Sequence, residues 1–181
     1  MRYTLSGLYG ITDPTLMPTL DQMLIQVERS LMGGATLIQY RDKSPDSEKR
    51  LSEASALNHL CQRYAVPLII NDDVALAETV AAAGVHLGQS DGNIKDARTR
   101  LGPNAIIGVT CHDSLALAEK AALDGADYVA FGAFFPSKTK PHAKAAPLEL
   151  IHSAKEKLTL PIVAIGGISV DNANKIIAAG A

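Results

Sequence analysis

The chain has 181 residues, of which 47% are apolar and 20% are charged, and this is the size and composition of one ordinary globular domain. Lys and Arg number 17 and Asp and Glu number 19, so the formal net charge is −2 and there is no basic footprint for nucleic acid. No apolar run approaches the roughly 20 residues of a membrane helix, and the start of the chain lacks a signal-peptide pattern, so we expect a cytoplasmic protein.

Seven short apolar runs of the β type recur along the chain, with helical patterns between them. Several are continuous in Val, Ile and Leu, which is typical of strands in a sheet that helices cover. The predicted strands are residues 8–12, 37–41, 68–71, 85–88, 106–110, 128–132 and 162–166. The predicted helices are residues 21–31, 46–64, 74–82, 94–101, 115–123, 148–158 and 170–178.

Seven strand–helix units in series leave two α/β architectures open, a doubly wound sheet or a (β/α)8 TIM barrel. A glycine follows a helical pattern four times, and we expect it in the left-handed conformation just past each helix, at Gly34, Gly84, Gly125 and Gly180. A strand follows the first three, whereas the chain ends after the fourth. Because such barrels usually need about 200 residues, we interpret residues 1–181 as a single TIM-barrel domain truncated after its seventh βα unit. The alternative is a natural seven-stranded form.

Polar or glycine-rich segments follow six successive predicted strands, and in parallel α/β folds the chemistry lies at this C-terminal edge. These segments are residues 41–43, 71–73, 89–91, 110–113, 134–141 and 166–167. We expect all six to face one mouth. This convergence points to an active site more strongly than any one segment does.

The charges at these strand ends favour a diphosphate substrate. Arg41, Lys43 and Lys140 supply three cations, of which arginine suits bidentate phosphate contact and lysine acts as a point charge. Asp72 and Asp91 follow neighbouring strands and are the hard oxygen ligands that Mg²⁺ takes, together with substrate phosphates. The sequence therefore predicts a magnesium site beside the cations.

A second anion site is indicated by hydroxyl and backbone N–H groups at residues 137–139 and at Gly167, since the late loops of barrels often hold a phosphate. Plainer interpretations stay open at this point. Residues 41–43 suit a solvated loop, Asp72 or Asp73 an N-cap, and the glycine at 167 close backbone packing. His86, inside an apolar strand, is interpreted as a core histidine.

The two cysteines, Cys61 and Cys111, lie far apart in the sequence and match neither a disulfide framework nor metal-ligand spacing. Cys111 follows a strand end, but no paired histidine geometry supports nucleophilic cysteine catalysis there. His112, its neighbour, stays open between a functional and a structural role.

The strand-end segments resemble those of a known family, thiamine phosphate synthase. The resemblance runs in chain order through GLYGITD, IQYRDK, LIINDD, GVHLGQSD, IIGVTCHD, GADYVAFGAFFPSKTKP and LPIVAIGGIS. One such block would be a weak signal, whereas seven collinear blocks are a strong one. The family is a (β/α)8 barrel that joins a hydroxymethylpyrimidine diphosphate to a thiazole phosphate, releasing diphosphate and making thiamine phosphate.

The resemblance implies a set of site residues. The implied metal ligands are Asp72 and Asp91, for Mg²⁺. Candidate catalytic residues are Arg41, Thr110 and Lys140, and many relatives carry serine at position 110, whose hydroxyl threonine keeps. Candidate substrate-binding residues are Gln39, Tyr40, Arg41, Asp42, Lys43, Asn71 and Thr110, and, from the later segments, Ser137, Lys138, Thr139, Lys140 and Gly167.

The family's reaction is understood as dissociative: diphosphate leaves first, and the thiazole nitrogen captures the pyrimidine-methyl carbocation. Such a reaction needs no strong base or nucleophile, but it needs groups that take up the charge of the departing diphosphate. Mg²⁺ on the two aspartates and the three cations suit that demand. We expect Thr110 to orient the diphosphate by a hydrogen bond.

The expected departure from the family is the eighth strand, which contributes to the thiazole phosphate site. We therefore expect an intact diphosphate half and a damaged thiazole half, which leaves the activity of this chain open. The alternatives are a thiazole tautomerase-like relative, an inactive remnant that only binds the pyrimidine diphosphate, and a sugar-phosphate epimerase or isomerase. The retained diphosphate and metal residues argue against the tautomerase. The oligomeric state, including a homo-oligomer, is left open.

Overall fold

The computed structural model describes residues 3–136 and 145–181. In this part of the chain, seven strands alternate with seven helices. The chain divides into two compact units, Met1–Leu87 with Asp91–Ile106, and Gly88–Ser90 with Ile107–Ala181. The main boundary falls after the first residue of the fifth strand, so each unit holds consecutive strand–helix pairs.

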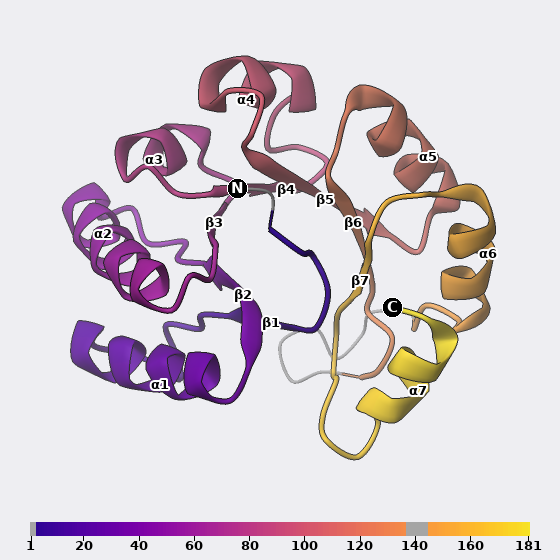
Figure 1. Cartoon of the computed structure of the whole chain (residues 1–181), viewed down its shortest axis with the longest axis horizontal. Helices are drawn as coiled ribbons and strands as arrows, with labels where there is room; N and C mark the ends of the chain where they lie inside the picture. Colours follow the sequence, from indigo (N-terminus) through magenta and orange to yellow (C-terminus); the bar gives the residue numbers. More distant parts are fainter. Residues whose placement is uncertain (1–2, 137–144) are drawn as a thin grey trace. The chain divides into compact units, whose positions relative to one another are not determined.

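The first unit is a parallel sheet with strand order β1-β2-β3-β4, and Figure 1 shows its helices on one side of these strands. The register pairs Gly10 with Ile38, Ile38 with Leu68, and Ile69 with Gly84. Its elements are β1 (Leu8–Ile11), α1 (Leu20–Met32), β2 (Ala35–Tyr40), α2 (Ser47–Arg63), β3 (Leu68–Asn71), α3 (Val74–Thr79), β4 (Gly84–Leu87) and α4 (Ile94–Leu101).

The core of the first unit lies between this sheet and its helices. Strand residues that are almost fully buried form it together with Leu57 of α2, and they include Ile38, Leu68, Ile69, Ile70 and Val85. Strands buried on both faces explain why the apolar runs are continuous rather than alternating. Each helix begins at a residue whose side chain accepts a backbone N–H, which satisfies one of the open donors of the first turn. These N-caps are Thr19, Asp46, Asp73 and Asn93.

The second unit contains most of β5 and the parallel strand order β5-β6-β7. Tyr128 is fully buried and packs on Gly108, where an added Cβ would lie 1.9 Å from the tyrosine Cζ. Glycine is therefore the residue that lets this ring fill the core. The elements are β5 (Ile106–His112), α5 (Leu115–Asp124), β6 (Tyr128–Phe131), α6 (Glu149–Lys157), β7 (Ile162–Ala164) and α7 (Ala173–Ala179).

The seven predicted strands and seven predicted helices are confirmed, with differences at their ends. β2 begins at Ala35, two residues early, because Gly34 has a φ of +94° and Thr36 Oγ1 donates to the Ser6 carbonyl at 2.6 Å. α7 begins only at Ala173, because the Asn172 side chain accepts from the Ser169 amide at 2.8 Å and holds a turn there. The interpretation of residues 1–181 as a barrel domain truncated after its seventh βα unit stays a prediction.

Gly84 corrects one expectation about the helix ends. Gly34, Gly125 and Gly180 have positive φ as predicted, but Gly84 is the first residue of β4, and Ala81, with a φ of +50°, makes the left-handed turn after α3. A Cβ at Gly84 would lie 1.8 Å from the Ile106 carbonyl oxygen. Glycine is required at this position by close backbone approach, not by a turn.

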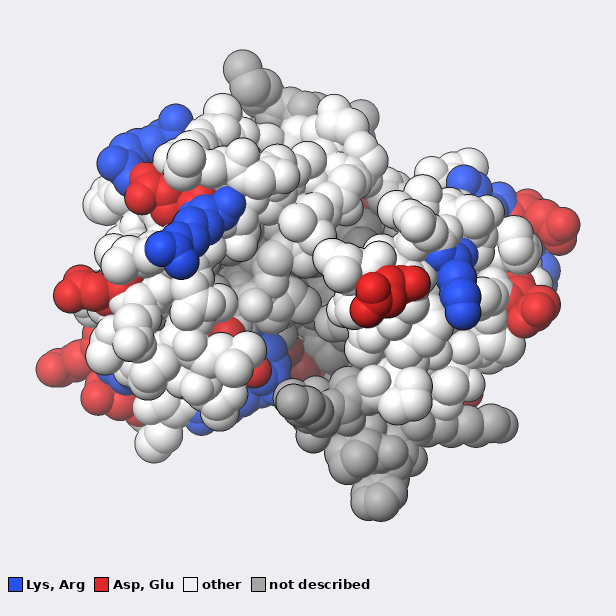
Figure 2. Space-filling view, turned by 90° about the horizontal axis from the view of Figure 1, so that it is seen from below, with Lys and Arg blue, Asp and Glu red and all other residues white. Residues whose placement is uncertain are grey.

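Charged side chains of both signs are mixed over the surface that Figure 2 displays, without a broad patch of one sign among the described residues on that face. This distribution agrees with the net charge of −2. None of the described helices has the length and apolar character that a membrane span requires.

Both cysteines are fully buried, and burial raises the pKa of Cys61 to about 12 and that of Cys111 to about 11. Because the thiolate is the reactive form, both thiols should be inert in the folded chain. We expect Ellman's reagent at pH 8 to detect no thiol within minutes in the native protein and both after guanidinium unfolding. Rapid reaction of one native thiol would contradict this packing.

Candidate active site

Residues 39–43, at the end of β2 and in the loop after it, place successive side chains on opposite sides of the chain. Gln39 Nε2 donates to the Tyr9 hydroxyl of β1 at 2.7 Å, and Lys43 Nζ pairs with Asp72 beyond β3. Tyr40 and Asp42 instead contact side chains of α2. This alternation is that of extended backbone, whose side chains point to opposite faces in turn.

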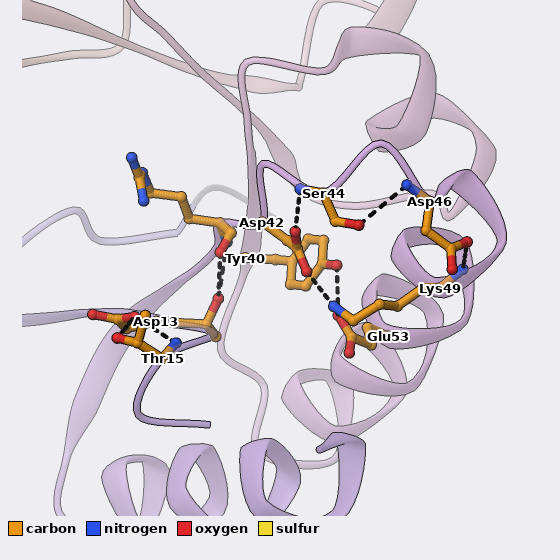
Figure 3. Close-up of polar contacts among 10 residues, drawn as sticks. Asp13, Thr15, Tyr40, Asp42, Ser44, Asp46, Lys49 and Glu53 are labelled. Carbon is orange, nitrogen blue, oxygen red and sulfur yellow. Dashed lines mark hydrogen bonds and ion pairs between the residues drawn. The ribbon is translucent and has the colours of Figure 1, made fainter. Parts of the chain in front are cut away.

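On the α2 side, Tyr40, Asp42, Lys49 and Glu53 form a polar cluster (Figure 3). The Tyr40 hydroxyl donates to Glu53 Oε2 at 2.7 Å, and Lys49 Nζ pairs with Asp42 Oδ2 and, at 2.9 Å, with Glu53 Oε2. Burial and the Glu53 carboxylate raise the pKa of Tyr40 well above its usual range, so its hydroxyl stays a donor. The side chains of Tyr40 and Asp42 are thus engaged within the protein.

The contacts within this cluster keep Asp42 and Lys49 in their charged forms. Burial acts to raise the pKa of Asp42, but hydrogen bonds from Lys49 and the Ser44 amide outweigh it, and the pKa is lowered. Burial likewise acts to lower the pKa of Lys49, and its bonds to Asp42 and Glu53 raise it instead. Both groups are therefore ionised at neutral pH.

The backbone of Arg41 is fixed by Thr12, which follows β1. The Arg41 amide donates to Thr12 Oγ1 at 2.9 Å, and the Thr12 amide donates to the Gln39 carbonyl at 2.9 Å. The Arg41 side chain is exposed and takes part in no ion pair within the described residues. Its guanidinium is therefore available to an anionic ligand.

Asp72 follows β3 in a left-handed conformation, with a φ of +62°. Its amide donates to the His86 carbonyl at 2.8 Å, while its Oδ2 accepts from Asn71 Nδ2 at 2.6 Å and pairs with Lys43. Asp73, its neighbour, caps α3 by accepting from the Leu76 amide at 2.8 Å. The N-cap interpretation thus applies to Asp73, and the Asp72 carboxylate is directed to a cation and an amide.

The carboxylate of Asp72 has the chemistry of a magnesium ligand, because its oxygens are the hard donors that Mg²⁺ takes. One of them, Oδ2, already attracts the Lys43 ammonium. Asp91 is half-buried in the segment between β4 and α4. Among the described residues, no group of three or more His, Cys, Asp and Glu side chains could hold a metal ion. A site of two carboxylates completed by substrate phosphates does not require such a group.

The second unit holds Thr110 and Gly167. The Thr110 carbonyl, in β5, accepts from Gln89 Nε2 at 2.6 Å. A Cβ at Gly167 would lie 2.4 Å from the Pro136 carbonyl oxygen, so close backbone packing is one reason for this glycine. Four predicted site residues lie outside the described part of the chain: Ser137, Lys138, Thr139 and Lys140.

His86 is 7% exposed within β4, as a core histidine should be. Burial lowers its pKa to about 4, although the Asp72 charge opposes that shift, so the imidazole is neutral at pH 7. His112 is exposed at the end of β5 with a φ of +52°. The imidazole of His86 therefore adds no cation to the strand ends at neutral pH.

Comparison with known proteins decides the family. The model of the thiamine monophosphate synthase family matches residues 8–181. The chain is 57% identical to a thiamine-phosphate synthase of Saccharophagus degradans over 173 residues, which cover 96% of this chain and 80% of the relative. The chain belongs to the thiamine monophosphate synthase family. It is accordingly a transferase of thiamine biosynthesis, as the sequence predicts.

Solved structures agree with this family and with its fold. A thiamine phosphate pyrophosphorylase from Pyrococcus furiosus is 36% identical, with a TM-score of 0.84 over 96% of this chain and 81% of the other. An N-acetylmannosamine-6-phosphate 2-epimerase from Clostridium perfringens, 15% identical with a TM-score of 0.65 over 96% of this chain and 82% of the other, shares the fold alone. The predicted α/β fold of the TIM-barrel type is confirmed.

Sequence analysis of the thiamine monophosphate synthase motifs missed the side chains of α2. Lys49 and Glu53 are four residues apart on one face of the helix, and Tyr40 has a polar tip that needs a buried partner. The helical spacing and the buried hydroxyl together could have suggested that Tyr40 contacts Glu53. Arg50, which pairs with Asp73, gives no such signal, because its partner lies 23 residues away.

Proposed function

We propose that this chain joins a hydroxymethylpyrimidine diphosphate to a thiazole phosphate, releasing diphosphate and forming thiamine phosphate. The observation that carries the proposal is the meeting of Lys43, Asn71 and Asp72 at the ends of β2 and β3. A carboxylate, an ammonium and an amide at one point suit a metal-bound diphosphate better than a neutral ligand. Membership of the family supports the same substrates.

In this proposal, Asp72 and Asp91 hold Mg²⁺, which when bound supplies neutralising charge to the diphosphate oxygens. The Asp72 carboxylate fits this role as a hard oxygen donor, and its Oδ2 already attracts one cation, the Lys43 ammonium. Arg41, Lys43 and Lys140 stabilise the departing diphosphate, and Thr110 orients it by a hydrogen bond. Arg41 supports this assignment because no ion pair engages its guanidinium within the described residues.

The remaining assignments position the two substrates. Gln39 and Asn71 bind the pyrimidine diphosphate, and Ser137, Thr139 and Gly167 bind the thiazole phosphate. The bond from the pyrimidine methylene carbon to the diphosphate oxygen breaks with its electron pair going to oxygen. The thiazole nitrogen then donates its lone pair to the resulting carbocation, so the protein needs to position groups and exclude water rather than supply a base.

The side chains of Tyr40 and Asp42, both in the substrate-binding prediction, are turned toward α2. We assign them a supporting role, in which their backbone lines the site while their side chains anchor the strand end. Lys138 is kept as a substrate-binding candidate next to Ser137. A thiazole tautomerase-like activity would need only the thiazole phosphate site, and the cluster around Asp72 favours the synthase over it.

The test is calorimetric titration of the chain with hydroxymethylpyrimidine diphosphate, with and without Mg²⁺, followed by a turnover assay with the thiazole phosphate. We expect binding that depends on Mg²⁺ and formation of thiamine phosphate. Binding without turnover would favour a remnant that only holds the pyrimidine diphosphate. Absence of binding would contradict the proposed substrate.

A further inference from the structure

Two adjacent cations in the first turn of α2 hold the two segments that carry the diphosphate residues. Lys49 pairs with Asp42, which lies between Arg41 and Lys43 in the sequence. Arg50 pairs with Asp73, the neighbour of Asp72. We propose that Lys49 and Arg50 are positioning residues that fix the cationic and the metal-binding halves of the site from α2. This inference rests on the proposed function.

Lys49 acts on the segment after β2. The Asp42 side chain is only 4% exposed, and its Oδ1 accepts from the Ser44 amide at 2.5 Å while its Oδ2 pairs with Lys49. Glu53 holds Lys49 from the next turn of the helix at 2.9 Å. Because successive side chains here point to opposite sides, fixing Asp42 sets the directions of Arg41 and Lys43.

Arg50 acts on the segment after β3. Asp73 uses Oδ1 to cap α3 and Oδ2 to pair with the guanidinium of Arg50. The Nε of Arg50 is buried with no hydrogen-bond partner among the described residues, so its ion pair with Asp73 dominates the placement of the guanidinium. Asp73 is thus held from two sides, and Asp72 directly before it is held with it.

The charge balance separates these two cations from Arg41, which is assigned to the substrate. Lys49 and Arg50 are each paired with carboxylates of the protein, whereas the Arg41 guanidinium has no ion pair within the described residues. Lys43 is also paired, but its partner Asp72 is the carboxylate that we assign to Mg²⁺, whereas the partners of Lys49 and Arg50 are assigned to no ligand. A cation paired with carboxylates of this second kind holds its partners in place. Ordering the site before the substrate arrives lowers the entropy cost of binding.

The experiment compares steady-state kinetics of the full chain and its variants. Lys49→Met and Asp42→Asn test the first ion pair, and Arg50→Met and Asp73→Asn test the second. Asparagine at 42 keeps an acceptor for the Ser44 amide, and asparagine at 73 keeps an N-cap. Arg63→Met is the matched control, because it breaks the ion pair of α2 with Glu28 at the other end of the helix.

Loss of the Lys49 pair should raise KM for the pyrimidine diphosphate by about three- to tenfold, the cost of ordering side chains on binding, and leave KM for the thiazole phosphate unchanged. Loss of the Arg50 pair should raise by a similar factor the Mg²⁺ concentration that gives half-maximal rate. The double variant of Lys49 and Asp42 should be no worse than either single variant. The control should leave all three quantities unchanged.

Equal changes in both KM values, or variants that behave like the control, would overturn the positioning role while wild-type turnover still supports the proposed function. A wild-type chain with neither turnover nor Mg²⁺-dependent binding of inorganic diphosphate would overturn the proposed function, and the positioning role with it. If Lys49→Met does not fold, the nearly isosteric Asp42→Asn variant decides the first half of the test.

Discussion

An Asp72→Asn variant should fold like the wild-type chain and lose at least about a hundredfold in turnover, the usual cost of removing one group that stabilises charge in the transition state. Asn tolerates the left-handed φ of +62° at this position, so the backbone should be unstrained. The substitution removes the charge that pairs with Lys43 and that we assign to Mg²⁺. Rates measured over a range of Mg²⁺ concentrations, together with melting temperatures, test this expectation.

Asp21→Asn is the control for this substitution, because Asp21 is exposed in the first turn of α1 and also loses a carboxylate. We expect its turnover and its Mg²⁺ dependence to match those of the wild-type chain. An Asp72→Asn variant that retained more than about a tenth of the wild-type rate would remove Asp72 from the metal site.

A Gly84→Ala variant should be destabilised by about 3 kcal/mol or more, at or beyond the upper end of typical overpacking effects. The added Cβ would meet the Ile106 carbonyl oxygen at 1.8 Å, and a backbone atom cannot move aside as a flexible side chain can. Relief would require β4 to shift from its pairing with β3, where Gly84 lies opposite Ile69. The free energy of unfolding, measured by urea titration, reports the loss.

Gly33→Ala is the control, because it makes the same substitution at another glycine of the first unit. Gly33 has a φ of −77°, and a Cβ there would approach the Arg29 carbonyl oxygen only to 3.3 Å. We expect this variant to differ from the wild-type chain by less than about 1 kcal/mol. A Gly84→Ala variant of similar stability would mean that the backbones of residues 84 and 106 do not approach so closely.

The order and type of the elements could be predicted because short, mostly apolar runs of the β type alternate with longer helical patterns along the chain. The position of Gly84 could not, because the atom that demands a glycine belongs to Ile106, 22 residues farther along the chain. The sequence pattern at Gly84 matches that at Gly125, where the left-handed turn does occur. Local sequence therefore cannot separate a glycine required by its own φ from one required by a distant backbone.

In the candidate site too, local sequence predicts some features, while others depend on residues far along the chain. Strand ends locate Arg41, Lys43 and Asp72, since the C-terminal edge of a parallel sheet is where polar residues gather. Which side chains of this segment face the ligand is not visible in the sequence, because it depends on which residues of α2 lie behind the strand. Asp42 illustrates this: it is flanked by two site cations, yet its own carboxylate is engaged by Lys49.

The alternation of residues 39–43 also constrains how this segment can change. A substitution within it changes one side chain and leaves the others on their original sides of the segment. An insertion of a single residue between Tyr40 and Arg41 would reverse the sides that the later residues face. Arg41 and Lys43 would then point toward α2, and the Asp42 carboxylate would point toward the proposed diphosphate site. The five residues thus behave as a segment of fixed length, in which spacing carries as much information as identity.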